Sequence, residues 1–483
     1  MASDLKKKTL SGMIWSFVQR FGTMAISFVS NIVLARLLTP DDYGTIGMLM
    51  IFIAVANTFV DGGFGSALIQ KKEPTKEDYS TIFWWNMFLS VVLYGLLFIG
   101  APAVARFYNL PLLCDVLRVQ GFVLIVNALS IIQQNQLRKQ LKFKRLAMVT
   151  VISATLSAGI AIILAYMGWG VWALVAQQLM LSGFTAILLW VLNKWYPSLV
   201  FSKESFKQLF GFGGFILLSN LINTFCDNIQ GILLGKFFNP AALGYYTQAR
   251  KLEEVATTSI SGVINQVAYP VLSVFQYDIN GLIKALKKFI QCIAFIVFPL
   301  MLLLIIIAKP TIILLYSDKW LMSVPYFQIL CIAGLAISLQ MINYNAIAAI
   351  GKSDVLFKWT IIKRGLGLAF NIGGLIIYGV YGLLIGGVIT AYTLYLINSY
   401  LVSKFLGYKI KQQLRDLFPI LFSALIAFIL TLLYNDIVTF ESSSFILLLS
   451  DTIIYGLCYI AISALINKQV IKEVKGLLLK IIH

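Results

Sequence analysis

The sequence predicts an all-α polytopic membrane protein built from about fourteen transmembrane helices. Hydrophobic residues make up 59% of the 483 positions and charged residues only 12%, whereas charged residues reach roughly a quarter of a typical soluble chain. A second observation is an internal repeat, because IVLARLLTPDDYG at 32–44 is matched by ILLGKFFNPAALGYY at 232–246. Each copy ends one long apolar run, turns before a proline and opens another run. The repeated unit is therefore a pair of spanning helices.

The predicted spans are apolar runs of roughly 20 residues, the length that crosses a bilayer. Each repeat holds six of them. Because six is an even number, the second copy starts on the same side of the membrane as the first, and the two halves are parallel copies. The spans lie at 11–37, 41–69, 79–103, 112–134, 146–167, 171–193, 207–235, 241–274, 285–308, 323–350, 354–378, 381–402, 413–434 and 444–466.

This arrangement divides the chain into five parts. The last two spans have no counterpart in the repeat, so they are additions to it. The tail alternates lysines with apolar residues, which is typical of a helix lying in the membrane interface. We expect an N-terminal six-helix bundle at 1–194, a cytoplasmic linker at 195–206, a C-terminal six-helix bundle at 207–402, two additional transmembrane helices at 403–466 and a basic amphipathic cytoplasmic tail at 467–483.

The net charge of +18 is distributed by loop. On a soluble protein such a charge would suggest nucleic acid as a partner, but here basic clusters such as 138–145 fall in every second loop. The positive-inside rule therefore places both termini in the cytoplasm. The pattern predicts contacts with anionic membrane lipids and no nucleic-acid partner. The loops on the opposite side carry only Arg36, Arg106, Lys236, Lys309 and Lys319.

Four segments resemble a known family. LARLLTPDDYGTIGM at 34–48 and DGGFGSALIQKKE at 61–73 resemble the paired N-terminal signatures of the polysaccharide transporter family. RKQLKFKRLAM at 138–148 and NPAALGYYTQARKLE at 239–253 are similar to its Wzx-type, colanic-acid-exporter-like branch. The resemblance implies membership of the multidrug, oligosaccharidyl-lipid and polysaccharide flippase superfamily. Its members have two six-helix bundles around a central cavity.

The same resemblance implies a function. Members of this branch move undecaprenyl-pyrophosphate-linked oligosaccharide repeat units across the bacterial inner membrane by alternating access, for the biosynthesis of lipopolysaccharide or exopolysaccharide. The implied partners are the polyprenyl-pyrophosphate-linked glycan, membrane lipids, a polysaccharide polymerase and a chain-length regulator. One alternative is a multidrug or other small-solute exporter of the same superfamily. Another is a membrane polysaccharide polymerase or ligase, although such an enzyme would be expected to carry a large outer loop.

Polar stripes in the first and seventh spans predict a wet interior. Arg20 lies about nine residues into its span, which is roughly 14 Å deep at 1.5 Å per residue. Polar residues follow it at helical spacing, and a similar stripe occurs about two hundred positions later. Lipid penalises such groups by several kcal/mol, so the stripes must face protein or water. Hydrogen bonding between helices is the alternative explanation. The substrate-cavity candidates in these spans are Arg20, Asn220, Asn223 and Asp227.

Further charges lie at similar depth in the eighth and eleventh spans. The resemblance gives them a role, because guanidinium groups bind phosphate oxygens bidentately. Arg250 and Glu254 are four positions apart on one helix face, so an internal ion pair is the alternative for Arg250. Arg118, near the outer end of its span, could instead extend toward water. The cavity candidates of this kind are Arg250, Lys251, Lys363, Arg364 and Arg118.

Four residues are candidates for ion coupling or for hinges. Asp61 precedes a run of glycines in the second span, where a carboxylate could serve a coupling ion or a hinge, and a structural helix break is the alternative. Glu254 is the carboxylate closest in sequence to the deep cations of the eighth span. Pro40 and Pro240 set the equivalent turns of the two repeats.

No sequence pattern supports enzyme chemistry. The single histidine is His483, and no H-E-x-x-H, C-x-x-C, nucleophile-elbow or Gly-rich phosphate motif occurs. We therefore expect no catalytic residue, no metal and no cofactor. An ATPase engine is absent from the sequence too. Active transport would then need an ion gradient, with Na+ and H+ as the candidates, or consumption of the substrate outside.

Overall fold

The structure is a computed structural model that describes residues 2–437 and 443–473. The elements in these ranges are α-helices and one 3-10 turn, which confirms the predicted all-α fold class. The chain divides into two compact units, Met1–Gly244 and Tyr245–His483. The part of the predicted basic tail beyond residue 473 lies outside the described residues.

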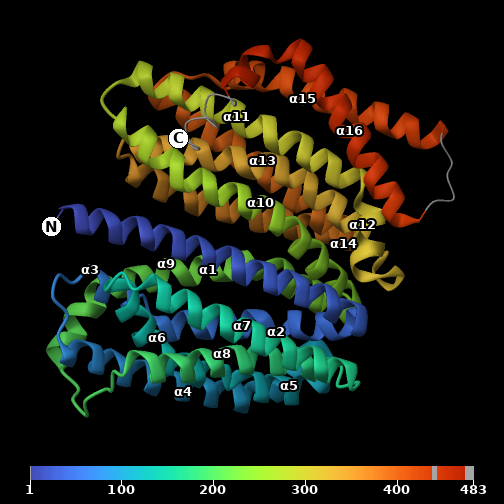
Figure 1. Ribbon diagram of the computed structural model, residues 1–483. Coiled ribbons are helices and arrows are strands. Elements are labelled where there is room, and N and C mark those ends of the chain that lie inside the picture. The colour runs from blue at the N-terminus through green and yellow to red at the C-terminus, as the bar shows by residue number, and fades with distance from the viewer. Residues whose placement is uncertain (1, 438–442, 474–483) are drawn as a thin grey trace. The chain divides into compact units, whose positions relative to one another are not determined.

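The helices of the first unit are α1 (Ala2–Leu37), α2 (Pro40–Asp61), α3 (Phe64–Gln70), α4 (Lys76–Tyr108), α5 (Leu112–Gly121), α6 (Val123–Lys139), α7 (Phe143–Tyr166), α8 (Val171–Asn193), α9 (Lys203–Phe237) and the start of α10 (Pro240–Val274). The long helices run alongside one another (Figure 1). Within this unit α1 and α8 both pack against α7, and α9 packs against α2, α3 and α4.

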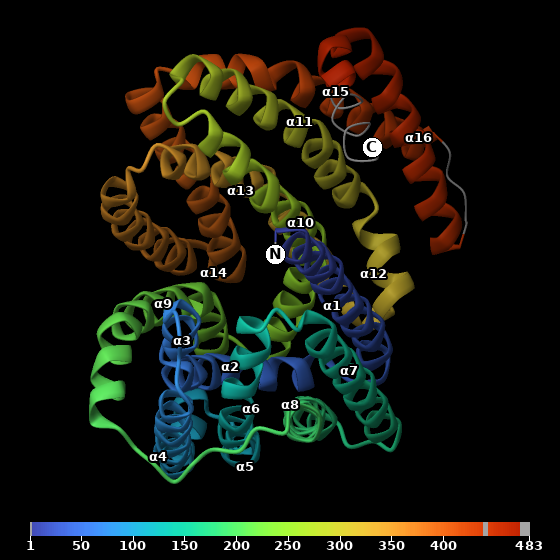
Figure 2. The same ribbon diagram turned by 60° about the vertical axis from the view of Figure 1, so that its left-hand side comes forward.

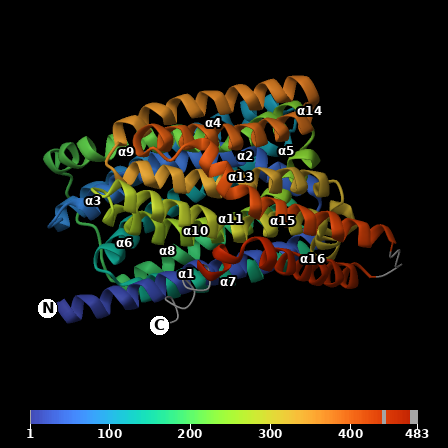
Figure 3. The same ribbon diagram turned by 90° about the horizontal axis from the view of Figure 1, so that it is seen from above.

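The second unit holds the rest of α10, followed by α11 (Ile279–Ile306), α12 (Ala308–Tyr316), the 3-10 turn η1 (Asp318–Trp320), α13 (Ser323–Ala349), α14 (Ser353–Leu406), α15 (Ile410–Ile437) and α16 (Ser444–Ile466). α13 is flanked by α11 and α14 (Figure 2). α15 packs against both α11 and α16, and the two last helices lie side by side (Figure 3). The two additional spans are therefore packed onto the second unit.

The predicted number of fourteen spans is not confirmed. Eleven helices among the described residues are long and apolar enough to cross a membrane, or twelve if the bent α9 is counted. α14 is counted once, although non-helical backbone at Tyr378 and Gly379 breaks it between the predicted spans 354–378 and 381–402. The predicted span 241–274 corresponds to α10, which is not among the eleven and carries four charged residues at 250–254.

Side-chain caps fix where the key helices begin. Thr39 precedes α2, and its hydroxyl accepts a hydrogen bond from the Asp42 amide at 3.3 Å while the Asp42 carboxylate accepts one from the Thr39 amide at 2.9 Å. This reciprocal arrangement is a capping box, which satisfies amides that the first turn of a helix leaves unpaired. At the equivalent turn of the second repeat, the Asn239 side chain accepts from the Ala242 amide at 2.8 Å. Both repeat turns are thus specified locally by the residue before the proline.

An aromatic core joins the linker to the first unit. Phe64 and Phe83 are buried in one cluster with Trp190, and the rings of Phe83 and Trp190 lie 6.1 Å apart. Residues 194–202 are not helical, but the Ser198 amide donates to Ser80 Oγ at 2.9 Å and the Ser198 carbonyl accepts from Trp84 Nε1 at 2.8 Å. These bonds hold the linker against α4. The domain boundary at 195–206 stays a prediction.

Candidate functional site

The two repeat turns touch each other inside the first unit. An alanine Cβ built at Gly44 would overlap the carbonyl oxygen of Pro240, and one built at Gly244 would overlap the carbonyl oxygen of Pro40. These four residues form reciprocal contacts between the first turns of α2 and α10, which we call the repeat contact. Only glycine allows two backbones to approach this closely. The matching prolines and glycines are therefore a packing device as well as a sign of duplication.

A second pair of contacts flanks the repeat contact. The Lys236 ammonium donates to the Phe107 carbonyl oxygen at 2.5 Å and lies 4.2 Å from the centroid of the Phe107 ring. An alanine Cβ at Gly235 would lie 2.9 Å from Met48 Cγ and 3.0 Å from Tyr108 Cε1. The end of α9 is thus held against α2 and α4, and a lysine predicted only from topology has a packing role.

Asp61 lies where α2 breaks. It is the last residue of α2, and Gly62 and Gly63 both adopt left-handed backbone before α3 begins. Arg138 is the cation that acts on the Asp61 carboxylate electrostatically. The carboxyl end of α3 is held by Lys139, whose ammonium donates to the carbonyl oxygens of Leu68, Ile69 and Lys71. This geometry is that of a hinged short helix.

The other candidates of the first unit lie on different helices. Arg20 is exposed on α1, and the hydroxyl of Thr23 donates to its carbonyl oxygen at 3.1 Å. On α9, Asn220 and Asp227 are exposed and Asn223 is half-buried. Arg118 is held on α4, because its guanidinium lies 4.6 Å from the centroid of the Phe98 ring and its Nε donates to the Phe98 carbonyl oxygen at 3.4 Å.

The charged residues of α10 form a group in the second unit. The Arg250 guanidinium pairs with the Glu254 carboxylate at 2.7 Å, so the predicted ion pair is present. Another of its nitrogens donates to the Tyr246 hydroxyl at 3.0 Å. Lys251 is exposed, and Glu253 is buried with 5% of its surface accessible. Arg250 and Glu254 keep 36% and 45% of their side-chain surface accessible, so an anion can reach this pair.

Lys363 is buried between the two arms of α14. Its side chain is 7% accessible, and the ammonium donates to Asn398 Oδ1 and lies 6.0 Å from the centroid of the Tyr344 ring. The Asn398 amide nitrogen in turn donates to the Gln340 carbonyl oxygen at 3.0 Å. The sequence gave no acidic neighbour for Lys363, and the structure supplies a neutral partner instead. Arg364, the next residue, is half-buried.

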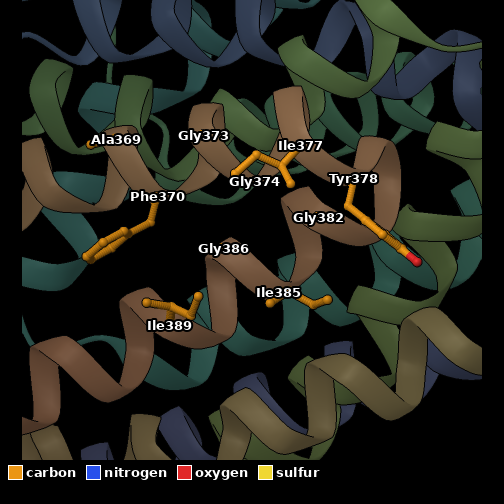
Figure 4. Close-up of a pocket in the computed structure, with 10 residues that line it drawn as sticks. All are labelled: Ala369, Phe370, Gly373, Gly374, Ile377, Tyr378, Gly382, Ile385, Gly386 and Ile389. Carbon is orange, nitrogen blue, oxygen red and sulfur yellow. The ribbon is translucent and has the colours of Figure 1, made fainter.

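An apolar groove of about 390 Å³ follows the same two arms of α14 (Figure 4). Glycines bring the arms together, because an alanine Cβ at Gly374 would overlap the Gly382 carbonyl and one at Gly386 would overlap the Phe370 carbonyl. Phe370, Ile385 and Ile389 line the groove, and Tyr378 lies at one end. Such a lining accommodates hydrocarbon and offers nothing to a charged head group.

A buried polar network fastens α15 to the rest of the second unit. The Asn343 amide nitrogen donates to Ser399 Oγ at 3.0 Å and to Gln413 Oε1 at 3.1 Å. Asp416 accepts from the Lys287 ammonium and from the Tyr408 hydroxyl, both at 2.7 Å. Burial and this hydrogen bond to Asp416 raise the pKa of Tyr408, so the hydroxyl keeps its proton and remains a donor.

The sequence analysis missed the residues that hold the deep charges. Asn398 lies in the apolar run LYLINSYLV, and Asn343 lies in LQMINYNAIAAI. A signal was available, because isolated amides inside an apolar span must find a partner within the protein. The pairing itself could not be deduced from one sequence, because it depends on how the two arms of α14 and α13 are packed.

These features define a polytopic membrane protein with two helical units and charged residues inside its spans. Its fold is that of the solved structure titled lipid II flippase MurJ in an inward closed conformation: the TM-score is 0.75 and the identity 15%, covering 95% of this chain and 100% of that one. The sequence profile described as "Polysaccharide biosynthesis protein" matches residues 33–325. The chain belongs to this family, which confirms the resemblance found in its sequence.

Two curated relatives agree with the family. Over 405 residues the chain is 29% identical to the teichuronic acid biosynthesis protein TuaB of Bacillus subtilis, covering 81% of this chain and 84% of that one. Over 375 residues it is 24% identical to the lipopolysaccharide biosynthesis protein WzxC of Escherichia coli, covering 77% of this chain and 76% of that one. The similarity therefore extends over most of each protein.

Proposed function

We propose that this protein is a flippase that moves polyprenyl-pyrophosphate-linked oligosaccharide units across the cytoplasmic membrane of a bacterium by alternating access. The observation that carries the proposal is membership of the polysaccharide biosynthesis family, with a match over residues 33–325. Two further observations support it: relatives named for teichuronic acid and lipopolysaccharide biosynthesis, and the fold shared with a lipid II flippase. The protein acts as a transporter and not as an enzyme.

The deep cations give the proposal a mechanism. Arg250 already holds a carboxylate at 2.7 Å and is partly accessible, so a phosphate group can replace Glu254 as its partner. Lys363, Arg364 and Arg20 are the further cations that would stabilise a pyrophosphate away from water. The polyprenyl chain stays in lipid or against apolar surface during the movement. A multidrug exporter for cationic compounds would instead be expected to present unpaired acids.

The proposal includes an orientation and partners. Both termini face the cytoplasm, and a polysaccharide polymerase and a chain-length regulator act on the product outside. No cofactor is required, and Na+ or H+ remains the candidate for coupling. The family's polysaccharide products imply the inner membrane as the location.

Cysteine labelling is expected to test the orientation. Lys142→Cys and Lys409→Cys should resist an impermeant thiol reagent added to intact cells, whereas Arg106→Cys and Lys319→Cys should react, because basic loops stay in the cytoplasm. All four side chains are exposed, so burial will not mimic protection. Permeabilised cells provide the control in which all four react. Labelling of Lys142→Cys from outside would overturn the orientation.

Deletion of the gene is expected to test the function itself. Cells without the protein should accumulate lipid-linked oligosaccharide on the cytoplasmic leaflet and lose the corresponding surface polysaccharide, because the polymerase acts outside. A plasmid copy should restore both. If the lipid-linked intermediate reaches the outer leaflet normally while surface polymer is lost, the chain acts after flipping, as a polymerase or ligase would.

A further inference from the structure

Glu253 faces away from the partly exposed side of α10. Its neighbours Arg250 and Glu254 pair with each other, whereas Glu253 is 5% accessible and its Oε1 has no hydrogen-bond partner among the described residues. Thr257, one turn further along α10, is its side-chain hydrogen-bond partner. Burying a carboxylate without a cation is expensive. The chemistry of this position therefore requires a ligand that neutralises the acid.

The surroundings of Glu253 form a small built pocket. An alanine Cβ at Gly334 of α13 would lie 3.3 Å from Glu253 Oε1 and 2.8 Å from the sulfur of Met301 in α11. A glycine at this position thus makes room for the carboxyl group. The titratable and charged groups that act on it are Tyr246, Arg250 and Glu254 on α10 and Cys331 on α13.

A proton is the ligand that this pocket fits. The apolar wall of Met301 and Gly334 offers no second oxygen for a metal cation, and one carboxyl oxygen is unpaired. A hydrated ion prefers several oxygen ligands, whereas a proton needs only one. The O–H bond would form on Oε1 with a proton taken from water, and the proton would return to water when the bond breaks.

We propose that Glu253 binds a proton when an anion binds at Arg250, so that the substrate site is linked to proton uptake. This inference rests on the proposed function. An anion that takes the Arg250 guanidinium leaves the Glu254 carboxylate without its partner, one residue from Glu253. Adding negative charge there favours the neutral acid at Glu253. By linkage, the proton then strengthens binding of the anion to the same degree.

Inorganic pyrophosphate binding to the full-length protein in lipid nanodiscs tests the inference. The affinity of the wild type is expected to rise up to about tenfold for each unit by which pH falls, the limit for one linked proton. Titration calorimetry in two buffers of different ionisation enthalpy should register proton uptake on binding. Glu253→Gln, which keeps the shape of the side chain, should bind with a pH-independent affinity and without uptake.

Matched variants separate the proton from other causes. Glu254→Gln removes the competing carboxylate, so it should bind pyrophosphate more tightly and retain proton uptake. Glu253→Asp retains a titratable group and should retain uptake even if Glu253→Gln folds poorly. Glu77→Gln changes an exposed acid at the start of α4 and should match the wild type.

The outcomes distinguish the inference from the proposed function. Proton uptake that persists in Glu253→Gln, or no pyrophosphate binding by the wild type at any pH, would overturn the proton link. Neither result would touch the flipping phenotype of the deleted strain. Normal appearance of the lipid-linked oligosaccharide outside in that strain would overturn the function, whatever the calorimetry shows.

Discussion

Replacing Gly44 with alanine is expected to reduce flipping at least tenfold without lowering the amount of protein in the membrane. The added methyl group cannot coexist with the Pro240 carbonyl oxygen in the repeat contact. Overpacking of this kind costs about 1–3 kcal/mol, and a bias of that size shifts a two-state equilibrium roughly 5- to 150-fold. The conformation that contains the contact is depopulated, while the apolar spans that direct insertion stay unchanged.

Thiol labelling should show the opening directly. Met48 is 1% accessible and lies beside Gly235, so Met48→Cys in a cysteine-free background should react slowly with an impermeant reagent. Gly44→Ala should accelerate that reaction. Gly244→Ala should behave alike, and the double variant should add little, because both changes break one contact. Gly183→Ala is the matched control, since its added methyl group would meet no atom within 4 Å. Unchanged labelling and flipping in Gly44→Ala would mean that the contact has no part in the cycle.

Local sequence signals predicted the features that local chemistry determines. The spans follow from apolar runs, and the repeat turns follow from Thr39 before Pro40 and Asn239 before Pro240, whose side chains cap α2 and α10. The ion pair of Arg250 with Glu254 also follows from a spacing of four on one helix. Each of these interactions lies within a few residues of sequence, so one chain suffices to deduce it.

Interactions between distant segments could not be deduced in this way. The glycines of α14 suggested a turn, but their close approach to Gly382 and Phe370 depends on how the two arms pack. Lys139 was interpreted as a topology signal, and its role in holding the end of α3 depends on a contact about seventy residues away in the chain. Hydrophobic pattern alone does not reveal such partners.

The pairing of Lys287 with Asp416 is a third example. The two last spans matched the family only by hydropathy, so the sequence suggested additions with no specific attachment. The structure instead gives α15 an ion pair to α11 at 2.7 Å and, through Gln413, hydrogen bonds to Asn343 and Ser399. Buried groups of this kind must be satisfied within the protein. The polar residues near the start of α15 are therefore attachment points.

Replacing Lys363 with glutamine is expected to give the second large effect, the loss of flipping with normal protein abundance. A charge-assisted hydrogen bond to a buried group is worth about 1.5–3 kcal/mol, or roughly tenfold to more than a hundredfold in affinity. Glutamine can still bond to Asn398, so the packing between the arms of α14 survives while the charge is lost. Arg20→Gln and Arg364→Gln are expected to lose flipping in the same way. Complementation of a flippase-deficient strain, read beside an immunoblot, measures both quantities.

Three further variants decide what Lys363 does. Lys358→Gln is the matched control, because Lys358 is exposed on the same arm of α14 five residues earlier and should complement fully. Lys363→Arg should restore flipping only in part, since the wider guanidinium must fit a site that is 7% accessible in the wild type. Asn398→Leu should lower protein abundance, because it leaves the ammonium buried without a partner. If Lys363→Gln complements fully, or fails only because the protein disappears, the ammonium has no part in holding the pyrophosphate, and Arg250 remains the cation on which the mechanism depends.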